Sequence, residues 1–187
     1  MKIENSFEVA ASPQAAWELL MDVPRVIPCM PGATLTETVD DDHWKASMAV
    51  KLGPIGLNFV TDVAREATDA EARRAVLSAQ AREARGRGSA QATITSTLAA
   101  TDGGTRVDIV TDLALTGAVA QYGRGMVQAV AGQLTASFAG CLQAQLAPAA
   151  ATGEAPPPAP EARPVSGLRL GAKALLDTMR RAFRRRT

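Results

Sequence analysis

Histidine and cysteine supply many metal ligands and catalytic groups, and this chain of 187 residues contains very few of them. Its one histidine, His43, excludes any metal site or catalytic relay that needs two imidazoles. The two cysteines, Cys29 and Cys141, lie far apart, which excludes a framework of several disulfides and a four-cysteine zinc site. We interpret both as packed or idle thiols in a reducing compartment, and we expect no metal ion.

Long apolar runs are missing as well. No stretch of 18 or more residues is apolar throughout, so we expect no segment to span a membrane. The first ten residues lack the basic start and apolar middle of a secretory signal, which favours a cytoplasmic protein. Aromatic residues make up only 4%, but hydrophobic residues reach 47% and charged residues 21%, as is typical of globular domains. Alanine and threonine must therefore supply much of the core surface.

Charge is divided unevenly along the chain. Residues 148–187 contain eight basic and three acidic residues, a net charge of +5, whereas residues 1–147 contain twelve basic and sixteen acidic residues, a net charge of −4. Six of the eleven prolines fall in residues 148–164, which predicts a semi-rigid linker. The chain thus has an acidic body, residues 1–147, and a basic tail, residues 148–187. This division of charge indicates that the tail binds an anionic partner.

Residues 165–187 have the pattern of a basic amphipathic helix. At 100° per residue their apolar side chains fall within an arc of roughly 120°, and the basic ones fall outside it. This pattern is typical of helices that bind an anionic membrane surface or a protein groove, and a solvated charged end is the alternative. The acidic body and the lack of interleaved aromatics argue against nucleic acid. The predicted membrane-binding residues are Leu168, Leu175, Leu176, Met179, Phe183, Arg180, Arg181, Arg184, Arg185 and Arg186.

The pattern of the body predicts an α+β fold in one domain over residues 1–147. Alternating apolar residues indicate half-buried antiparallel strands, and a longer apolar period marks the final helix. The expected elements are a strand over 2–9, a helix from Ser12-Pro13 to Met21, a loop or broken short helix over 22–32, strands over 33–116 and a helix over 118–146. The natural arrangement is a curved antiparallel sheet of about six or seven strands gripping the long C-terminal helix, with the tail helix detached.

Several short motifs occur in an order that resembles the carbon monoxide dehydrogenase G-subunit family, within the START-like or polyketide cyclase-like helix-grip superfamily. The motifs are Pro13 with Trp17 and Leu20-Met-Asp22, Pro31-Gly32, Gly53-Pro54 with Phe59, Arg87-Gly-Ser-Ala90, Gly104-Thr105 and the helix GAVAQYGRGMVQAVAGQLTASFAGCL. One departure is Ala139, where many relatives have a second phenylalanine after Phe138. The resemblance implies an apolar cavity between sheet and helix, and an accessory role that recruits a molybdenum hydroxylase, such as carbon monoxide dehydrogenase, to the membrane.

Two features of the sequence favour a cavity over an ordinary filled core, which is the alternative. The strands are rich in small residues, and one long helix alone covers the sheet. The predicted ligand-binding residues are Ile27, Met30, Met48, Phe59, Ile94, Ile109, Tyr122, Met126 and Val130.

No constellation of residues indicates catalysis. His43 follows Asp40-Asp-Asp42, which predicts an exposed turn, and no Gly-x-Ser-x-Gly elbow is present. Gly86-x-Gly88 lacks the following helix of a phosphate cradle and predicts a hairpin turn. We therefore expect a protein that is not an enzyme and has no covalent cofactor.

Three functions remain open at this point. The first is a binding protein on the inner face of the cell membrane, which holds an apolar ligand and brings a molybdenum hydroxylase or its electrons to the bilayer. A quinone is the expected ligand, inferred from the cavity, the tail and the partner of the family. The second is a recruitment or assembly factor without a ligand, and the third is a cyclase-like or hydrolase-like enzyme.

Overall fold

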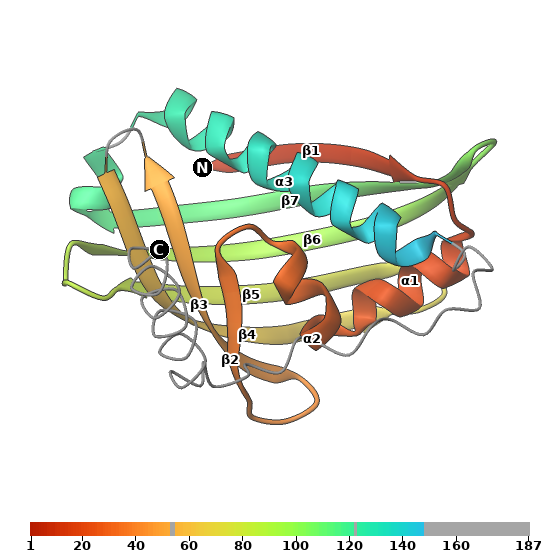
Figure 1. The fold of residues 1–187 in the computed structure, drawn as a ribbon, viewed down its shortest axis with the longest axis horizontal. Coiled ribbons are helices and arrows are strands. Elements are labelled where there is room, and N and C mark those ends of the chain that lie inside the picture. Colours follow the sequence, from red (N-terminus) through yellow and green to blue (C-terminus); the bar gives the residue numbers. More distant parts are fainter. Residues whose placement is uncertain (53–54, 122, 148–187) are drawn as a thin grey trace, which may run out of the picture. The chain divides into compact units, whose positions relative to one another are not determined.

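Seven antiparallel strands form one sheet that curves around a long helix, α3 (Figure 1). The computed structural model describes residues 1–52, 55–121 and 123–147. The sheet has the order β1-β7-β6-β5-β4-β3-β2, so that β2 to β7 are joined to their neighbours in sequence and β1 closes against β7. The strands are β1 (Lys2–Val9), β2 (Ala33–Thr38), β3 (His43–Leu52), β4 (Ile55–Asp69), β5 (Arg74–Glu83), β6 (Gly88–Thr101) and β7 (Gly104–Gly117).

This architecture confirms the α+β fold expected from the sequence, with seven strands in the curved sheet. The predicted linker over 148–164 and the amphipathic helix over 165–187, with its residues from Leu168 to Arg186, lie outside the described residues. No helix in the described ranges is both long enough and apolar enough to cross a bilayer.

Helix α1 (Pro13–Met21) begins where the sequence predicts it. The Ser12 hydroxyl accepts a hydrogen bond from the Ala15 N–H at 3.3 Å, and Pro13 occupies the first helical position, which needs no N–H donor. Asp22 ends α1 and then caps the next turn, because its side chain accepts from the Arg25 N–H. The segment after it is a broken helix made of α2 (Val23–Val26) and the 3-10 turn η1 (Ile27–Cys29).

The final helical region is shorter than the sequence predicts. The expected helix over 118–146 is divided into a 3-10 turn, η2 (Ala118–Gln121), and the helix α3 (Arg124–Leu146), which begins after Gly123. Val119, assigned to the helix from its spacing, is buried on η2 against Leu57 and Phe59. A glycine at the N-cap favours a new helix start over a continuous helix, which explains the break.

Two apolar clusters contact the space between the sheet and α3. The larger joins α1, α2, the second half of α3 and the adjoining strands, and there Phe7 packs edge-to-face on Phe138 with ring centroids 6.2 Å apart. The smaller is formed by Leu57, Phe59 and Val119. The core is therefore divided, and the space between the clusters is the candidate site.

The turn between β5 and β6 is held by a buried acid. Glu83 accepts hydrogen bonds from the backbone N–H of Arg85 and of Arg87, and its carboxylate pairs with the Arg87 guanidinium at 2.8 Å. Hydrogen bonding by Arg87 lowers the pKa of Glu83 to about 2. Gly88 has a φ of 142°, and a Cβ there would lie 2.2 Å from the Thr116 carbonyl oxygen, so only glycine fits. The hairpin predicted at Gly86-x-Gly88 is thus confirmed.

Candidate ligand-binding cavity

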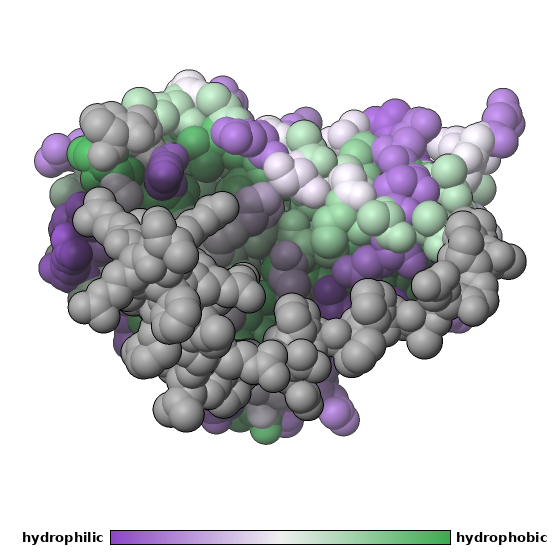
Figure 2. Space-filling view, in the orientation of Figure 1, coloured by the Kyte–Doolittle hydropathy of each residue, from purple (hydrophilic) through white to green (hydrophobic). Residues whose placement is uncertain are grey.

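A cavity of about 460 Å³ lies between the concave face of the sheet and α3. Its size falls within the range of ligand sites for small molecules. Figure 2 shows apolar residues, coloured green, on the walls of the hollow that faces the viewer. Every strand and helix of the described body contributes at least one residue to the lining.

Strand alternation builds the sheet side of the wall. On β7, every second residue from Val107 to Leu115 lines the cavity, and the residues between them do not. The same alternation on β4 presents Leu57, Phe59, Thr61 and Val63. The cavity wall is therefore a direct consequence of the period-two pattern in the sequence.

Alanines leave the space open at the middle of the sheet. Ala79 pairs with Ala92, and Ala81 pairs with Ala90, so that four methyl groups form one continuous patch on β5 and β6. In a close-packed protein interior, side chains from both layers normally fill such a gap. Each alanine contributes only a methyl group to the wall, so this patch fills less of the space than larger side chains would.

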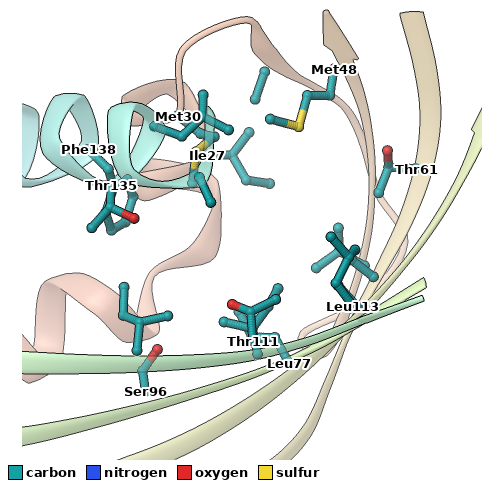
Figure 3. Close-up of a pocket in the computed structure, with 18 of the residues that line it drawn as sticks. Ile27, Met30, Met48, Thr61, Leu77, Ser96, Thr111, Leu113, Thr135 and Phe138 are labelled. Atoms are coloured by element: carbon teal, nitrogen blue, oxygen red, sulfur yellow. The ribbon is translucent and has the colours of Figure 1, made fainter. Parts of the chain in front are cut away.

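Seven of the nine residues predicted to bind a ligand line this cavity. They are Ile27, Met30, Met48, Phe59, Ile94, Ile109 and Val130. In Figure 3, Ile27 and Met30 lie on one side of the space and Met48 on another. Ligand binding by these residues stays a prediction, and Tyr122 lies outside the described residues.

The structure differs from the prediction at Met126. This side chain is 43% exposed and does not line the cavity. Residues spaced by four turn 400° around a helix, so each step drifts by 40°. Met126 is three such steps from Phe138 and has drifted by about 120°, and α3 faces the cavity instead with Val127, Val130, Ala131, Leu134, Thr135 and Phe138.

Several lining residues were not singled out from the sequence, although the signal was present. Leu113 and Leu115 share the parity of Ile109 on β7, and Thr61 shares the parity of Phe59 on β4. Trp17 is 7% exposed and contributes to the wall from α1. Strand parity alone would have found the first three, whereas the contribution of α1 depends on how the helix docks.

The two cysteines form a disulfide, and the expectation of two free thiols is wrong. The Cα atoms of Cys29 on η1 and Cys141 on α3 are 5.3 Å apart, a usual separation for a disulfide. Gln145 lies beside the bridge and donates to the Arg25 carbonyl oxygen at 3.3 Å. The prediction failed because a separation of 112 residues in the sequence does not determine the distance between two residues in the fold. Since the cysteines are paired, they no longer support the inference that the protein lies in a reducing compartment.

The disulfide fixes one wall of the cavity to another. Cys29 lies between Ile27 and Met30, which line the cavity, and Cys141 follows the lining residue Phe138 by one helical turn. The bridge therefore holds the η1 segment against α3.

One charged side chain, Arg65, is present among the described residues that line the cavity, and its charge is fully engaged. Its Nε donates to the Asp42 carboxylate at 2.7 Å, and its two Nη atoms donate to the carbonyl oxygens of Met21 and Asp41. The guanidinium also lies 5.3 Å from the ring centroid of Trp44, within cation–π range. Arg65 thus ties β4 to α1 and to the β2–β3 turn.

His43 is close to Arg65 in the fold but does not belong to the cavity wall. Its side chain is 57% exposed in the β2–β3 turn, where its Nδ1 is 2.8 Å from an Asp40 carboxylate oxygen. The backbone N–H of Asp42 and the His43 ring together lower the pKa of Asp40. The exposed turn predicted from the sequence is confirmed, and His43 does not line the cavity. Within the described ranges, no three His, Cys, Asp or Glu side chains are grouped so as to hold a metal ion.

Solved structures of other proteins have a fold similar to that of this chain. A conserved protein from Geobacillus kaustophilus is 21% identical, with a TM-score of 0.70 over 79% of this chain and 95% of that one. A START superfamily protein from Mycobacterium smegmatis is 16% identical, with a TM-score of 0.52 over 78% and 96%. The Zhui aromatase/cyclase from a Streptomyces species is 13% identical, with a TM-score of 0.56 over 78% and 93%. At these identities the likeness shows a START-like fold.

A search of curated protein sequences gives no match. The model of one sequence family, the carbon monoxide dehydrogenase G-subunit family (CoxG), matches residues 6–147, which include every residue of the cavity wall except Ile3 and Asn5. The resemblance drawn from the motifs is confirmed by this match. The chain therefore belongs to the CoxG family of carbon monoxide dehydrogenase subunits.

Proposed function

We propose that this protein binds an apolar small molecule in its cavity and acts as an accessory to carbon monoxide dehydrogenase. The observation that carries the proposal is the cavity of about 460 Å³, with a wall built from apolar side chains on both layers of the fold. Transfer of an apolar molecule from water into such a space is favourable in proportion to the apolar area buried. Family membership supports the accessory role.

The finer proposal is that the ligand is a quinone and that the basic tail attaches the protein to the inner leaflet. The tail carries a net charge of +5, and anionic lipids give the cytoplasmic leaflet a negative surface potential. A quinone dissolves in the bilayer and accepts electrons, which a water-soluble oxidoreductase must deliver to it. The protein would then present the quinone to the enzyme without changing it chemically.

The two tryptophans of the chain allow a direct binding test, because they lie in different places. Trp17 lines the cavity, whereas Trp44 does not and packs on Arg65. In the full-length Trp44→Phe variant, a short-chain ubiquinone should quench the fluorescence of Trp17 with saturation. In the matched Trp17→Phe variant, the same additions should quench Trp44 only weakly.

Native mass spectrometry of the full chain, delipidated and then mixed with quinones and phospholipids, gives an independent measure. A complex of one ligand per chain, with the ligand recovered at unchanged mass, is the expected result. A folded protein that takes up no quinone and no lipid contradicts ligand binding and favours a recruitment factor without a ligand. A ligand recovered at changed mass favours an enzyme.

The accessory role needs its own assay, with purified carbon monoxide dehydrogenase, carbon monoxide and vesicles that contain a quinone. Reduction of the quinone should depend on this protein and should fall when the tail is removed. Equal rates with and without the protein contradict the role.

A further inference from the structure

Among the described residues that line the cavity, one has a buried hydroxyl group without a hydrogen-bond partner. Thr61 on β4 is 9% exposed, and its Oγ1 is buried and unpaired. Its cross-strand neighbours are Ala46 on β3 and Ala81 on β5, whose side chains offer no polar atom. Figure 3 shows Thr61 on the wall of the space across from Thr135 of α3.

An unpaired buried hydroxyl destabilises a folded protein, because water has been removed from it and nothing has replaced that water. Among the described residues, no hydrogen bond holds Oγ1 in its present position. Threonine occupies discrete χ1 rotamers, and rotation between them moves the hydroxyl to a new direction without moving the backbone. A ligand that offers an acceptor atom can therefore draw the hydroxyl toward the cavity.

The rest of the wall determines whether the cavity can accept a charged ligand. Arg65 is the charged residue among the described lining residues, and Asp42, two carbonyl oxygens and the Trp44 ring already engage its guanidinium. An ionised ligand would lose its water and find no free counter-charge in this part of the chain. Burial of an unpaired ion is far less favourable than burial of a neutral group of the same size.

We infer that the cavity selects uncharged ligands that carry a carbonyl oxygen, and that Thr61 is the residue that donates a hydrogen bond to this oxygen. The inference rests on the proposed function, since it concerns the same cavity. It narrows the ligand class to ketones, quinones and esters, and it sets ionised fatty acids and amines aside.

The test uses matched ligands and matched variants in the full-length protein. Tetralone and tetralin differ by one carbonyl oxygen, and methyl decanoate and decanoate differ by one charge at pH 7. Thr61→Val replaces the hydroxyl with a methyl group, and Thr61→Ser keeps a hydroxyl. Thr93→Val, at an exposed position on β6, is the control for the same chemical change away from the cavity.

In the wild-type protein and in Thr93→Val, calorimetry should show tetralone binding about 5- to 10-fold more tightly than tetralin, as expected for one net hydrogen bond. Thr61→Val should remove that preference and leave the affinity for tetralin unchanged, whereas Thr61→Ser should keep most of it. Methyl decanoate should bind at least about 100-fold more tightly than decanoate.

Two further readouts separate a binding role from a structural one. The infrared carbonyl stretch of bound tetralone should lie at lower frequency in the wild-type protein than in Thr61→Val. The ligand-free Thr61→Val variant should melt at a higher temperature than the wild-type protein, because the unpaired hydroxyl is gone.

Equal affinities for tetralone and tetralin in the wild-type protein, or tight binding of decanoate, would overturn this inference and leave the cavity as a ligand site. Failure of all four probes to bind a folded wild-type protein would overturn the proposed function, and the inference with it.

Discussion

Cys29 and Cys141 are 112 residues apart in the sequence and are joined by a disulfide, which links the 3-10 turn η1 to the helix α3. A bridge that closes so long a loop restricts the unfolded chain strongly. Reduction, or the Cys29→Ser and Cys141→Ser changes together, should lower the free energy of unfolding by about 2–5 kcal/mol. Chemical denaturation with and without a dithiol reductant measures this effect.

The double serine variant is also the control, since its stability should not respond to the reductant. Because Ile27 of η1 and the adjoining Met30 belong to the cavity wall, the reduced protein should also release a bound quinone faster than the oxidised one. Identical midpoints for the oxidised and reduced wild-type protein would show that the bridge does not constrain the fold.

Filling the alanine patch should block the ligand without unfolding the protein. In Ala92→Trp, the new ring enters the cavity and should lower quinone affinity by at least about 10-fold. The matched control is Ala114→Trp, which places the same ring on the exposed face of the neighbouring strand β7. Fluorescence titration measures affinity and circular dichroism checks the fold. Equal affinity in both variants would mean that the ligand binds elsewhere.

Acid should weaken the β5–β6 turn through Glu83. Its pKa is about 2 in the folded protein and near the ordinary value of 4.5 when unfolded, so the folded state holds the ionised form. This contribution to stability is complete above about pH 4.5 and is lost as the pH falls toward 2. In Glu83→Gln, the free energy of unfolding should be lower at pH 7 and should depend less on pH between about 5 and 2. A parallel acid dependence in the variant and the wild-type protein would assign the effect to other carboxylates.

The tail predicted from the sequence should bind anionic vesicles more weakly as salt rises, because part of the attraction is electrostatic. Leu175→Glu with Phe183→Glu should abolish vesicle binding, although every arginine remains. Co-sedimentation with vesicles of anionic and of neutral lipid measures this. A full-length protein that stays in the supernatant with anionic vesicles at low salt would contradict the membrane attachment.

His43→Ala should leave ligand binding and the support of quinone reduction unchanged, because His43 is exposed and lies outside the cavity wall. Loss of a general base lowers a rate by roughly 10²- to 10⁴-fold, which steady-state assays detect easily. Turnover of a ligand that disappears in this variant would show that the protein is an enzyme.

The sequence was sufficient for the sheet because strand alternation is a strong local signal. Parity on β4 and β7 placed Phe59 and Ile109 on the concave face, where the structure has them. The inward face of the helix was harder to predict, because residues spaced by four do not stay on one face over several turns. Met126 therefore faces solvent and not the cavity. The disulfide was beyond sequence reasoning, since it depends on how η1 docks on α3. The unpaired hydroxyl of Thr61 was also beyond it, since strand pairing decides which neighbours a threonine has.

The alanine patch on β5 and β6 has a consequence for how ligand size is set in this fold. Each of the four alanines lines the same cavity. Replacement of one alanine by valine or leucine would shorten the space by a small, local step while the strand pairing stays the same. The depth of the cavity is therefore adjustable at four separate positions. Proteins that share this backbone can accept ligands of different sizes through substitutions at these positions.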